Sequence, residues 1–381
     1  MMKIAKGRNG LVRLGIAMAV FFCAFANTKL FSKELQTVEI LLATKIRLPH
    51  PTRLTIDTGN NLWVKTGLND QLWVIDLDTG NVIMGGVERK IMTASHGGDA
   101  IKPKLITQLC LGQKGEILFA DILGRIFAVR EISKPILHIS GTGQYDHSGD
   151  GGIGINASFR SIGGLAVDKS GNIYIADTNS HRVKRIDSST NTITTFAGSG
   201  NRGFDGDGGL ATSAKLNFPN TISIDNSDNI FIADTENNCV RRVDASTKII
   251  STVAGSNECY CRGDGLCESG GDGKLADKAC IAKPTVITID SLNNLYIAEA
   301  GMHRVRLVDA TTGIIVTIAG TGEQGFSADG KIATDAKLNS PSGLAIDKFG
   351  HLYISDWGNN RIIKVDAKTK VVTTVAGNGL P

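Results

Sequence analysis

The sequence lacks an apolar run long enough to cross a membrane comfortably. The run that comes nearest, LGIAMAVFFCAFA from Leu14 to Ala26, has 13 residues, whereas a spanning helix needs about 20. Basic residues precede this run and small residues end it, as in a secretory signal peptide. These residues are Lys3, Lys6, Arg8, Arg13, Ala24 and Ala26. We expect cleavage after Ala26, with residues 27–36 as a linker; an uncleaved anchor is the alternative.

The sequence also lacks a charge excess once this segment is set aside. The whole chain has 41 Lys and Arg against 37 Asp and Glu, a formal net charge of +4. Residues 1–26 hold four basic residues and no acidic one, so the remaining chain is neutral. Nucleic-acid binding favours a basic stripe on the mature surface, so we expect no nucleic-acid partner. The predicted location is extracytoplasmic, either secreted or periplasmic.

Helical periodicity is absent as well, and the chain repeats itself instead. The stretch GLAVDKSGNIYIADTNSHRVKRIDSSTNTITTFAG from Gly164 matches TISIDNSDNIFIADTENNCVRRVDASTKIISTVAG from Thr221. Six such units are found, four of them closely related, with spacings of 55, 56, 57, 65 and 57 residues between equivalent positions. Those positions are Asp57, Gly112, Asp168, Asp225, Asp290 and Asp347.

Each unit predicts four short antiparallel strands, which we call a to d from the innermost outward. Runs rich in Val, Ile, Thr and aromatic residues alternate with turn sequences such as DKSGN and DASTK, a strand-and-hairpin pattern. Four-stranded units at regular spacing predict a β-propeller, whose sheets are buried between neighbouring blades. The predicted fold class is therefore all-β, a six-bladed β-propeller of four-stranded antiparallel blades, with units starting near residues 51, 106, 162, 219, 284 and 341.

The blade pattern LYIAD…HRVxxVD…TVAG, with the linker pattern GFxGDGG.AT.A.L, resembles the NHL-repeat family of six-bladed propellers. The resemblance covers residues 37–381 and is weaker in the first two units. Thr66 stands where other units carry an acid, and both Gln71 and Cys239 replace the arginine found at Arg182, Arg304 and Arg361.

The sequence leaves the closure of the ring open. Residues 37–46, TVEILLATKI, are predicted as a strand in the place of a strand d before blade 1. Blade 6 already carries its own candidate, VVTTVAG from Val371. One of these two strands closes the ring and the other pairs at an edge.

The b–c turns and the d–a connections are predicted to share one rim of the disc, the linker-side rim. Loop residues on a rigid scaffold are frequent binding sites, and the family resemblance implies that such a face binds proteins or other macromolecules. The candidate binding residues are Asn179, His181, Asn237, Asn238, His303, Asn359 and Asn360. We expect a binding scaffold with a protein partner, while glycan or peptide partners, and a purely structural role for these turn residues, stay open.

Two sets of acidic residues recur in the units. The first set ends strand b, at Asp177, Asp234, Glu299 and Asp356, and faces Arg182, Arg304 and Arg361 at the start of strand c. We interpret these as structural ion pairs. The second set lies in the linkers, at Asp150, Asp205, Asp207, Asp272 and Asp329. Aspartate suits tight turns, so calcium binding by these carboxylates is the weaker interpretation.

An enzyme is the alternative function, a metal-dependent lyase or lactonase acting at the central opening. The resemblance allows it, because NHL-like propellers include a zinc-dependent lyase and related folds hydrolyse lactones. The predicted starts of strand a place polar residues around the axis, namely Thr52, Arg53, Thr107, Gln108, Asn220, Thr221, Thr285 and Ser342. Only His50 lies near them, whereas catalytic zinc needs three protein ligands, and no GxSxG motif is present. We therefore predict no catalytic residue and no cofactor.

Four of the seven cysteines gather in the long linker between blades 4 and 5. They are Cys259, Cys261, Cys267 and Cys280, and in an exported chain cysteines normally pair. We expect two disulfides whose connectivity is open, with a four-cysteine zinc site as the rival. Cys110 is predicted to be a buried free thiol, and Cys239 lies at the rim.

Overall fold

The described part of the chain consists of β-strands and single-turn 3-10 helices in a computed structural model. It comprises residues 42–67, 72–84, 94–96, 99–101, 103, 105–130, 136–256 and 270–379. The predicted signal peptide and the linker 27–36 lie outside these residues, as do Cys259, Cys261 and Cys267.

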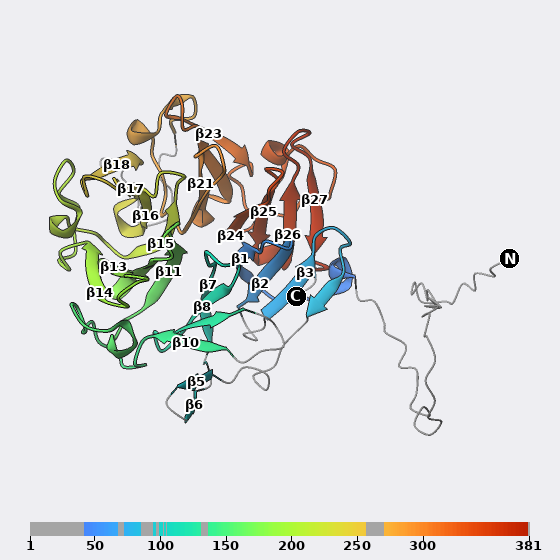
Figure 1. Ribbon diagram of the computed structural model, residues 1–381. Helices are drawn as coiled ribbons and strands as arrows, with labels where there is room; N and C mark the ends of the chain where they lie inside the picture. Colours follow the sequence, from blue (N-terminus) through green and yellow to red (C-terminus); the bar gives the residue numbers. More distant parts are fainter. Residues whose placement is uncertain are drawn as a thin grey trace, which may run out of the picture. The chain divides into compact units, whose positions relative to one another are not determined.

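Six antiparallel sheets form the blades of a six-bladed propeller, which confirms the predicted fold class (Figure 1). The innermost strands a are β1 (Pro51–Ile56), β7 (Ile106–Leu111), β11 (Ile162–Val167), β15 (Pro219–Ile224), β20 (Val286–Ile289) and β24 (Pro341–Ile346). Strands b are β2 (Asn61–Thr66), β8 (Ile117–Asp121), β12 (Ile173–Asp177), β16 (Ile230–Asp234), β21 (Leu295–Glu299) and β25 (Leu352–Asp356). Strands c are β3 (Leu72–Asp76), β9 (Ile126–Val129), β13 (Arg182–Ile186), β17 (Cys239–Val243), β22 (Arg304–Val308) and β26 (Arg361–Val365). The outer strands d are β4 (Val82–Met84), β10 (Leu137–Ser140), β14 (Ile193–Ala197), β18 (Ile250–Ala254), β23 (Ile314–Ala319) and β27 (Val372–Ala376).

Short elements connect the blades. A hairpin of β5 (Ala94–His96) and β6 (Asp99–Ile101) lies between blades 1 and 2, and β19 (Lys274–Leu275) adds a fifth strand to blade 5 through β23. Single-turn helices in the linkers are η2 (Gly154–Asn156), η4 (Ala211–Ser213), η6 (Ala276–Lys278) and η8 (Ala333–Asp335). Those in the b–c turns are η3 (Thr178–Ser180), η5 (Thr235–Asn237), η7 (Ala300–Met302) and η9 (Trp357–Asn359).

The recurring aspartate after strand a fixes the a–b turn. In blade 3, Asp168 Oδ1 accepts hydrogen bonds from the backbone N–H groups of Ser170 (3.0 Å) and Asn172 (2.8 Å). Its Oδ2 accepts from the Tyr174 hydroxyl at 3.1 Å, on the following strand b. A carboxylate that bonds nearby N–H groups in this way stabilises a tight turn. The same aspartate therefore recurs at each equivalent position except Gly112.

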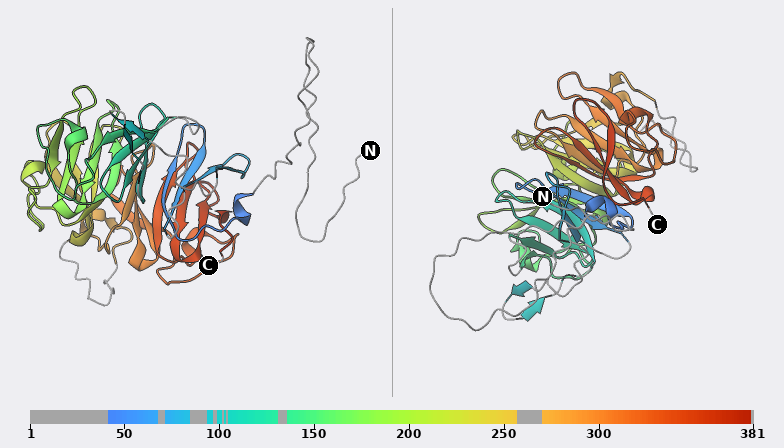
Figure 2. Two further views of the ribbon diagram at one scale, coloured as in Figure 1. Left: turned by 90° about the horizontal axis from the view of Figure 1, so that it is seen from below. Right: turned by 90° about the vertical axis from the view of Figure 1, so that its right-hand side faces the viewer.

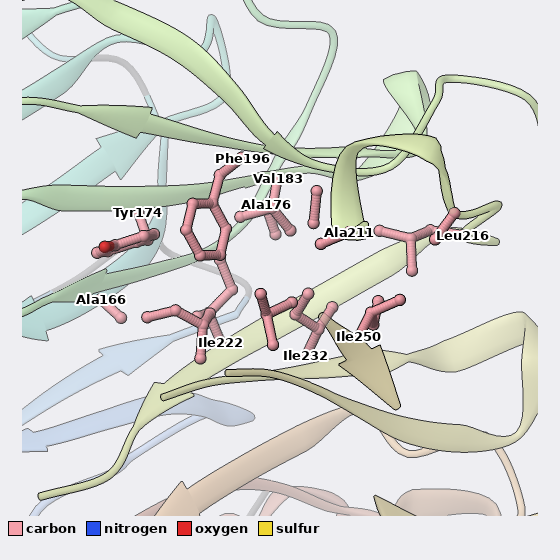
Figure 3. Close-up of a cluster of buried hydrophobic side chains, with 14 residues drawn as sticks. Ala166, Tyr174, Ala176, Val183, Phe196, Ala211, Leu216, Ile222, Ile232 and Ile250 are labelled. Carbon is pink, nitrogen blue, oxygen red and sulfur yellow. The ribbon is translucent and has the colours of Figure 1, made fainter. Parts of the chain in front are cut away.

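The core is divided among the spaces between neighbouring blades. Figure 3 shows the space between blades 3 and 4, where Tyr174 and Phe196 face Ile222 and Ile232. The two aromatic rings meet edge to face with their centroids 4.9 Å apart, a favourable geometry. Strands β8, β16 and β25 are buried at all five positions. Burial on both faces explains why runs such as IFIAD do not alternate between apolar and polar residues.

The ring closes through an entry linker rather than through an extra strand. Residues 42–46 were expected to be strand, but Ala43–Lys45 is a single-turn helix, η1. The Gly377 N–H donates to Ala43 O at 3.0 Å, just as Gly198 N–H donates to Ala211 O at 2.8 Å between blades 3 and 4. The expected strand was wrong here because LATKIRLPHP, residues 42–51, matches the linker sequence LATSAKLNFP, residues 210–219.

Blade 6 completes its own sheet, and it lies beside blade 1. Strand β27 pairs with β26 as its fourth strand. Strand β1 contacts β24, so the innermost strands form an unbroken ring of six. Figures 1 and 2 show the blue strands of blade 1 next to the red strands of blade 6. Both ends of the propeller therefore meet at this one junction.

Candidate functional site: the linker-side rim and its central funnel

Four of the predicted binding residues occupy the same structural position, the last residue of a b–c turn. His181, Asn238, His303 and Asn360 follow η3, η5, η7 and η9 and have left-handed backbone conformations, with φ of 53°, 53°, 49° and 51°. Asparagine is one of the non-glycine residues that adopts this conformation most readily. The left-handed backbone conformation by itself accounts for the asparagine found at two of the four positions, 238 and 360.

The side chains of these four residues link each blade to the next. His181 Nδ1 accepts from the Phe218 N–H (3.2 Å), and His303 Nδ1 accepts from the Ser340 N–H (3.0 Å). Asn238 Oδ1 accepts from the Lys283 N–H (3.0 Å), and Asn360 Oδ1 accepts from the His50 N–H (2.9 Å). Each donor stands directly before a strand a or its proline, in the following blade. Each of these acceptor atoms is therefore engaged within the molecule, and ligand binding by the four residues stays a prediction.

The other three predicted rim residues divide into two kinds. Asn237 Nδ2 donates to Gly203 O and to Asp234 Oδ2, both at 2.8 Å. Asn359 makes the equivalent two bonds, to Gly325 O and to Asp356 Oδ2. Both residues tie a linker to a strand b. Asn179 differs, because its Nδ2 donates at 3.2 Å to the hydroxyl of an exposed tyrosine, Tyr145.

Two of the three predicted ion pairs at the ends of strand b are confirmed. Arg304 Nε lies 2.7 Å from Glu299 Oε2, and Arg361 Nε lies 2.9 Å from Asp356 Oδ2. The expected pair of Asp177 with Arg182 was wrong. The Arg182 guanidinium instead donates to two backbone carbonyls, Ser180 O and Ser199 O.

Blade 4 satisfies its buried acid in another way. Cys239 replaces the arginine, and Asp234 accepts from the Asn217 N–H at 2.6 Å while Arg241 Nη1 lies 3.5 Å away. Burial raises the pKa of the Asp234 carboxyl to about 6, and these hydrogen bonds and the arginine oppose the shift. Burial also raises the pKa of Asp177 and of Asp356. The side chains of Asp177, Asp234 and Asp356 are fully buried, so we assign these three carboxyl groups a structural role.

The linker aspartates bind cations of the protein itself. Asp150 lies 2.8 Å from Lys184 Nζ, and Asp207 and Asp272 lie 2.6 and 2.5 Å from Nη2 of Arg241 and Arg306. Asp329 accepts from the N–H and hydroxyl of Thr374, and Asp205 Oδ1 accepts from the Gly206 N–H. Among the described residues no three His, Cys, Asp or Glu side chains gather as a metal site would require. Calcium binding by these aspartates gains no support from this arrangement.

A polar funnel opens at the axis on the linker-side rim, and all six blades contribute to it. It has a volume of about 550 Å³. Its lining includes six of the predicted polar residues at the starts of strand a, namely Thr52, Arg53, Thr107, Gln108, Asn220 and Ser342. Below it a channel of about 420 Å³ is lined by strands a, largely with Leu, Ile and Val. Thr221 lines the channel, and Thr285 lines neither cavity.

Arg53 and Gln108 line both cavities, so they mark the boundary between funnel and channel. Arg53 Nε donates to Gln108 Oε1 at 2.8 Å, and its Nη1 donates to Ser342 O at 3.0 Å. Desolvation lowers the pKa of Arg53 to about 10, which leaves the guanidinium charged at pH 7. A cation therefore lies at the boundary between funnel and channel.

Exposed aromatic side chains on the same rim were missed from the sequence. Trp357 lines the funnel, is 38% exposed and lies with its ring 4.4 Å from that of His50. Phe326 is 59% exposed over the Arg361 guanidinium, and Tyr145 is 71% exposed. The available signal was position, because each aromatic stands in a linker or a b–c turn rather than in a strand.

Of the described cysteines, Cys110 and Cys239 are free thiols. Cys239 is fully buried rather than displayed on the rim. Cys110 is only partly buried, since strand β7 borders the central channel. Burial raises the pKa of Cys110 to about 12 and that of Cys239 well above its usual range. Both thiols are therefore poor nucleophiles.

The described residues include no helix long and apolar enough to span a membrane.

Three segments of the chain, residues 159–186, 216–243 and 338–364, match a family model described as NHL repeat. Teneurin-1 of Mus musculus is 29% identical over 264 residues, which cover 63% of this chain and 9% of teneurin-1. NHL repeat-containing protein 2 of Bos taurus is 24% identical over 302 residues, or 58% of this chain and 41% of that protein. The chain thus spans less than half the length of either relative.

Among solved structures, an auxiliary nutrient binding protein from Bacteroides thetaiotaomicron is similar with a TM-score of 0.58. The match covers 86% of this chain and 70% of that protein at 16% sequence identity. At this identity the likeness concerns the fold alone.

Proposed function

The chain carries NHL repeats and folds as a six-bladed β-propeller, and from this premise we propose that it is an exported scaffold that binds a protein on its linker-side rim. The observation that carries the proposal is the exposure of Trp357, Phe326 and Tyr145 on that one rim. Exposed aromatic residues beside a polar pocket are typical of protein-binding surfaces, where Trp and Tyr contribute most of the affinity.

The proposal of export rests on residues 1–26. Glycan and peptide partners are alternatives, and the crosslinking experiment described below distinguishes them from a protein partner. The relatives do not identify the binding partner, because the match covers only 9% of teneurin-1.

The alternative of a metal-dependent lyase or lactonase finds no ligand set at the opening. The described residues that line the funnel include no His, Cys, Asp or Glu, whereas zinc requires N, S or O ligands of these types. Elemental analysis of purified Asn27–Pro381 after dialysis tests this alternative. Stoichiometric zinc or calcium would favour the enzyme.

Site-specific photocrosslinking tests the binding proposal. A benzophenone amino acid replaces Trp357 or Tyr145 in the exported chain, and Phe349 serves as the matched control. Phe349 is an aromatic residue with 62% exposure in the a–b turn of blade 6, on the opposite rim. We expect one discrete protein adduct in the extracytoplasmic fraction from both linker-side positions and none from Phe349. Equal adducts from both rims, or none from either, would contradict the proposal.

A further inference from the structure

The axial arginine of the funnel has no opposite charge. Arg53 donates three hydrogen bonds, to Gln108 Oε1, Ser342 O and Thr52 O. All three acceptors are neutral, and no carboxylate of the described residues pairs with the guanidinium. None of those residues accepts a hydrogen bond from its Nη2 atom. Arginines removed from water are normally paired with a carboxylate or phosphate.

Arg53 lies on a strand a, β1, and three arginines of strands c show how this protein pairs a buried guanidinium. Arg241, Arg306 and Arg361 each lie within 4 Å of two carboxylates, one from a linker and one from strand b. Arg53 differs from these three, and Arg182, which donates to backbone carbonyls alone, does not line the funnel. The position of Arg53, unlike theirs, is reached from an open funnel.

The funnel is electrostatically one-sided. The described residues that line it include no carboxylate, and the Arg53 guanidinium has only neutral acceptors. Low-dielectric walls strengthen the field of a charge at the base of a cleft. The hydroxyls of Thr52, Thr107 and Ser342 in the lining donate to backbone carbonyls, so their oxygens serve a ligand as acceptors. The Asn220 side chain adds an uncharged amide.

We infer that the funnel is a binding site for a carboxylate, which pairs with the Arg53 guanidinium at the base of the funnel. The carboxylate accepts from Nη2, the guanidinium nitrogen that has no acceptor among the described residues, and carries the single charge that one arginine neutralises. The hydroxyl and amide groups of the rim of the funnel accommodate the polar remainder of the ligand. The carboxylate belongs either to a free small molecule or to an acidic side chain of the protein partner proposed above.

Ligand-observed NMR with the full exported chain tests this inference and separates the two sources. The probes are succinate and the blocked peptide acetyl-Gly-Asp-Gly-amide, with inorganic phosphate as a competitor. We expect saturable binding of at least one carboxylate probe, with affinity at least about tenfold weaker in Arg53→Gln, the loss typical of a charged hydrogen-bonded pair. Binding of succinate alone indicates a free carboxylate, and binding of the peptide indicates an acidic side chain.

The matched control is Arg202→Gln. Arg202 is an exposed arginine of the linker between blades 3 and 4, its guanidinium lies over the Phe218 ring, and it does not line the funnel. This variant makes the same change of charge and is expected to bind like the wild type. Equal loss in both variants, tighter binding of phosphate than of either carboxylate, or no saturable binding would overturn the inference.

A second variant guards against a misfolded Arg53→Gln protein. Gln108→Glu places a carboxylate where Gln108 Oε1 now lies 2.8 Å from Arg53 Nε. We expect this internal partner to raise the melting temperature and to abolish binding of both probes. A lower melting temperature with unchanged binding would contradict the assignment. Because these measurements use purified protein and small probes, they can fail while crosslinking at Trp357 succeeds, and the reverse.

Discussion

At the scale of single residues, the left-handed residue that ends each b–c turn has a backbone role and a side-chain role together. We predict that Asn360→Ala lowers the free energy of unfolding by about 2 to 5 kcal/mol. The change leaves the His50 N–H without its acceptor, which costs about 1 to 3 kcal/mol, and places an alanine at a φ of 51°, which adds about 1 to 2 kcal/mol. Urea unfolding followed by circular dichroism measures the loss.

Two variants at the same position separate these contributions. Asn360→Asp keeps an acceptor oxygen and a residue that tolerates positive φ, so it is expected to lie within about 1 kcal/mol of the wild type. Asn360→Gly removes the acceptor without backbone strain, so its loss is expected to fall between those of the other two. If the glycine and alanine variants are as stable as the wild type, the hydrogen bond from the His50 N–H to Asn360 between blades 1 and 6 does not contribute to stability.

The sequence predicted where these residues lie but not what their polar atoms contact. The spacing of the units placed His181, Asn238, His303 and Asn360 in b–c turns. Their partners are backbone N–H groups of the next blade, and a backbone donor has no signature in the sequence. The same limit explains the error at Arg182, whose acceptors are carbonyl oxygens. Arg304 and Arg361 were predicted correctly because their partners are side chains.

At the scale of elements, the glycine after strand d in blades 2 to 6 allows that strand to end close to the backbone of the neighbouring b–c turn. Gly320 has a φ of +91°, and a Cβ atom built on it would lie 2.3 Å from His303 O. Gly330 in the same linker has a similar φ of +94°, with open space around it. Only the first position therefore requires glycine for steric as well as conformational reasons.

This pair gives a controlled prediction. Gly330→Ala is expected to cost about 1 to 2 kcal/mol for the positive φ alone. Gly320→Ala is expected to cost at least about 2 kcal/mol more, because the blade has to shift to remove the clash. Thermal and urea unfolding of both variants check the difference. Similar losses for the two variants would mean that the close approach of strand and turn relaxes without strain.

At the scale of the whole molecule, repetition in the sequence was enough to predict six blades but not how they close. The residues at the junction, from Leu42 to His50, belong to no complete unit, so the spacing of the repeats did not reveal their likeness to a linker. Arg53 shows a second limit of prediction from the repeats, which do not reveal the surroundings of a residue at the centre of the ring. Its place at a strand start was predicted, but the lack of a carboxylate near it depends on all six blades together.

The cysteines connect the fold with the proposed export. Of the six cysteines that follow Cys23, we predict that four are paired as two disulfides and that Cys110 and Cys239 stay reduced. In the native chain Cys239 has no exposed surface, and burial raises the pKa of both thiols. Thiol reagents at pH 8 act on thiolates, so native protein is expected to react slowly with them or not at all.

Titration of the exported chain with a thiol reagent then gives three distinct values. We expect about zero reactive thiols per chain in the native state, two after denaturation and six after denaturation with reduction, because the reagent reacts with accessible thiolates. The mass of the same sample shows whether the chain begins at Asn27. Six thiols without reduction, accompanied by zinc release, would replace the disulfides by the four-cysteine zinc site. Six thiols without zinc would contradict both assignments and remove the oxidising compartment as an argument for export.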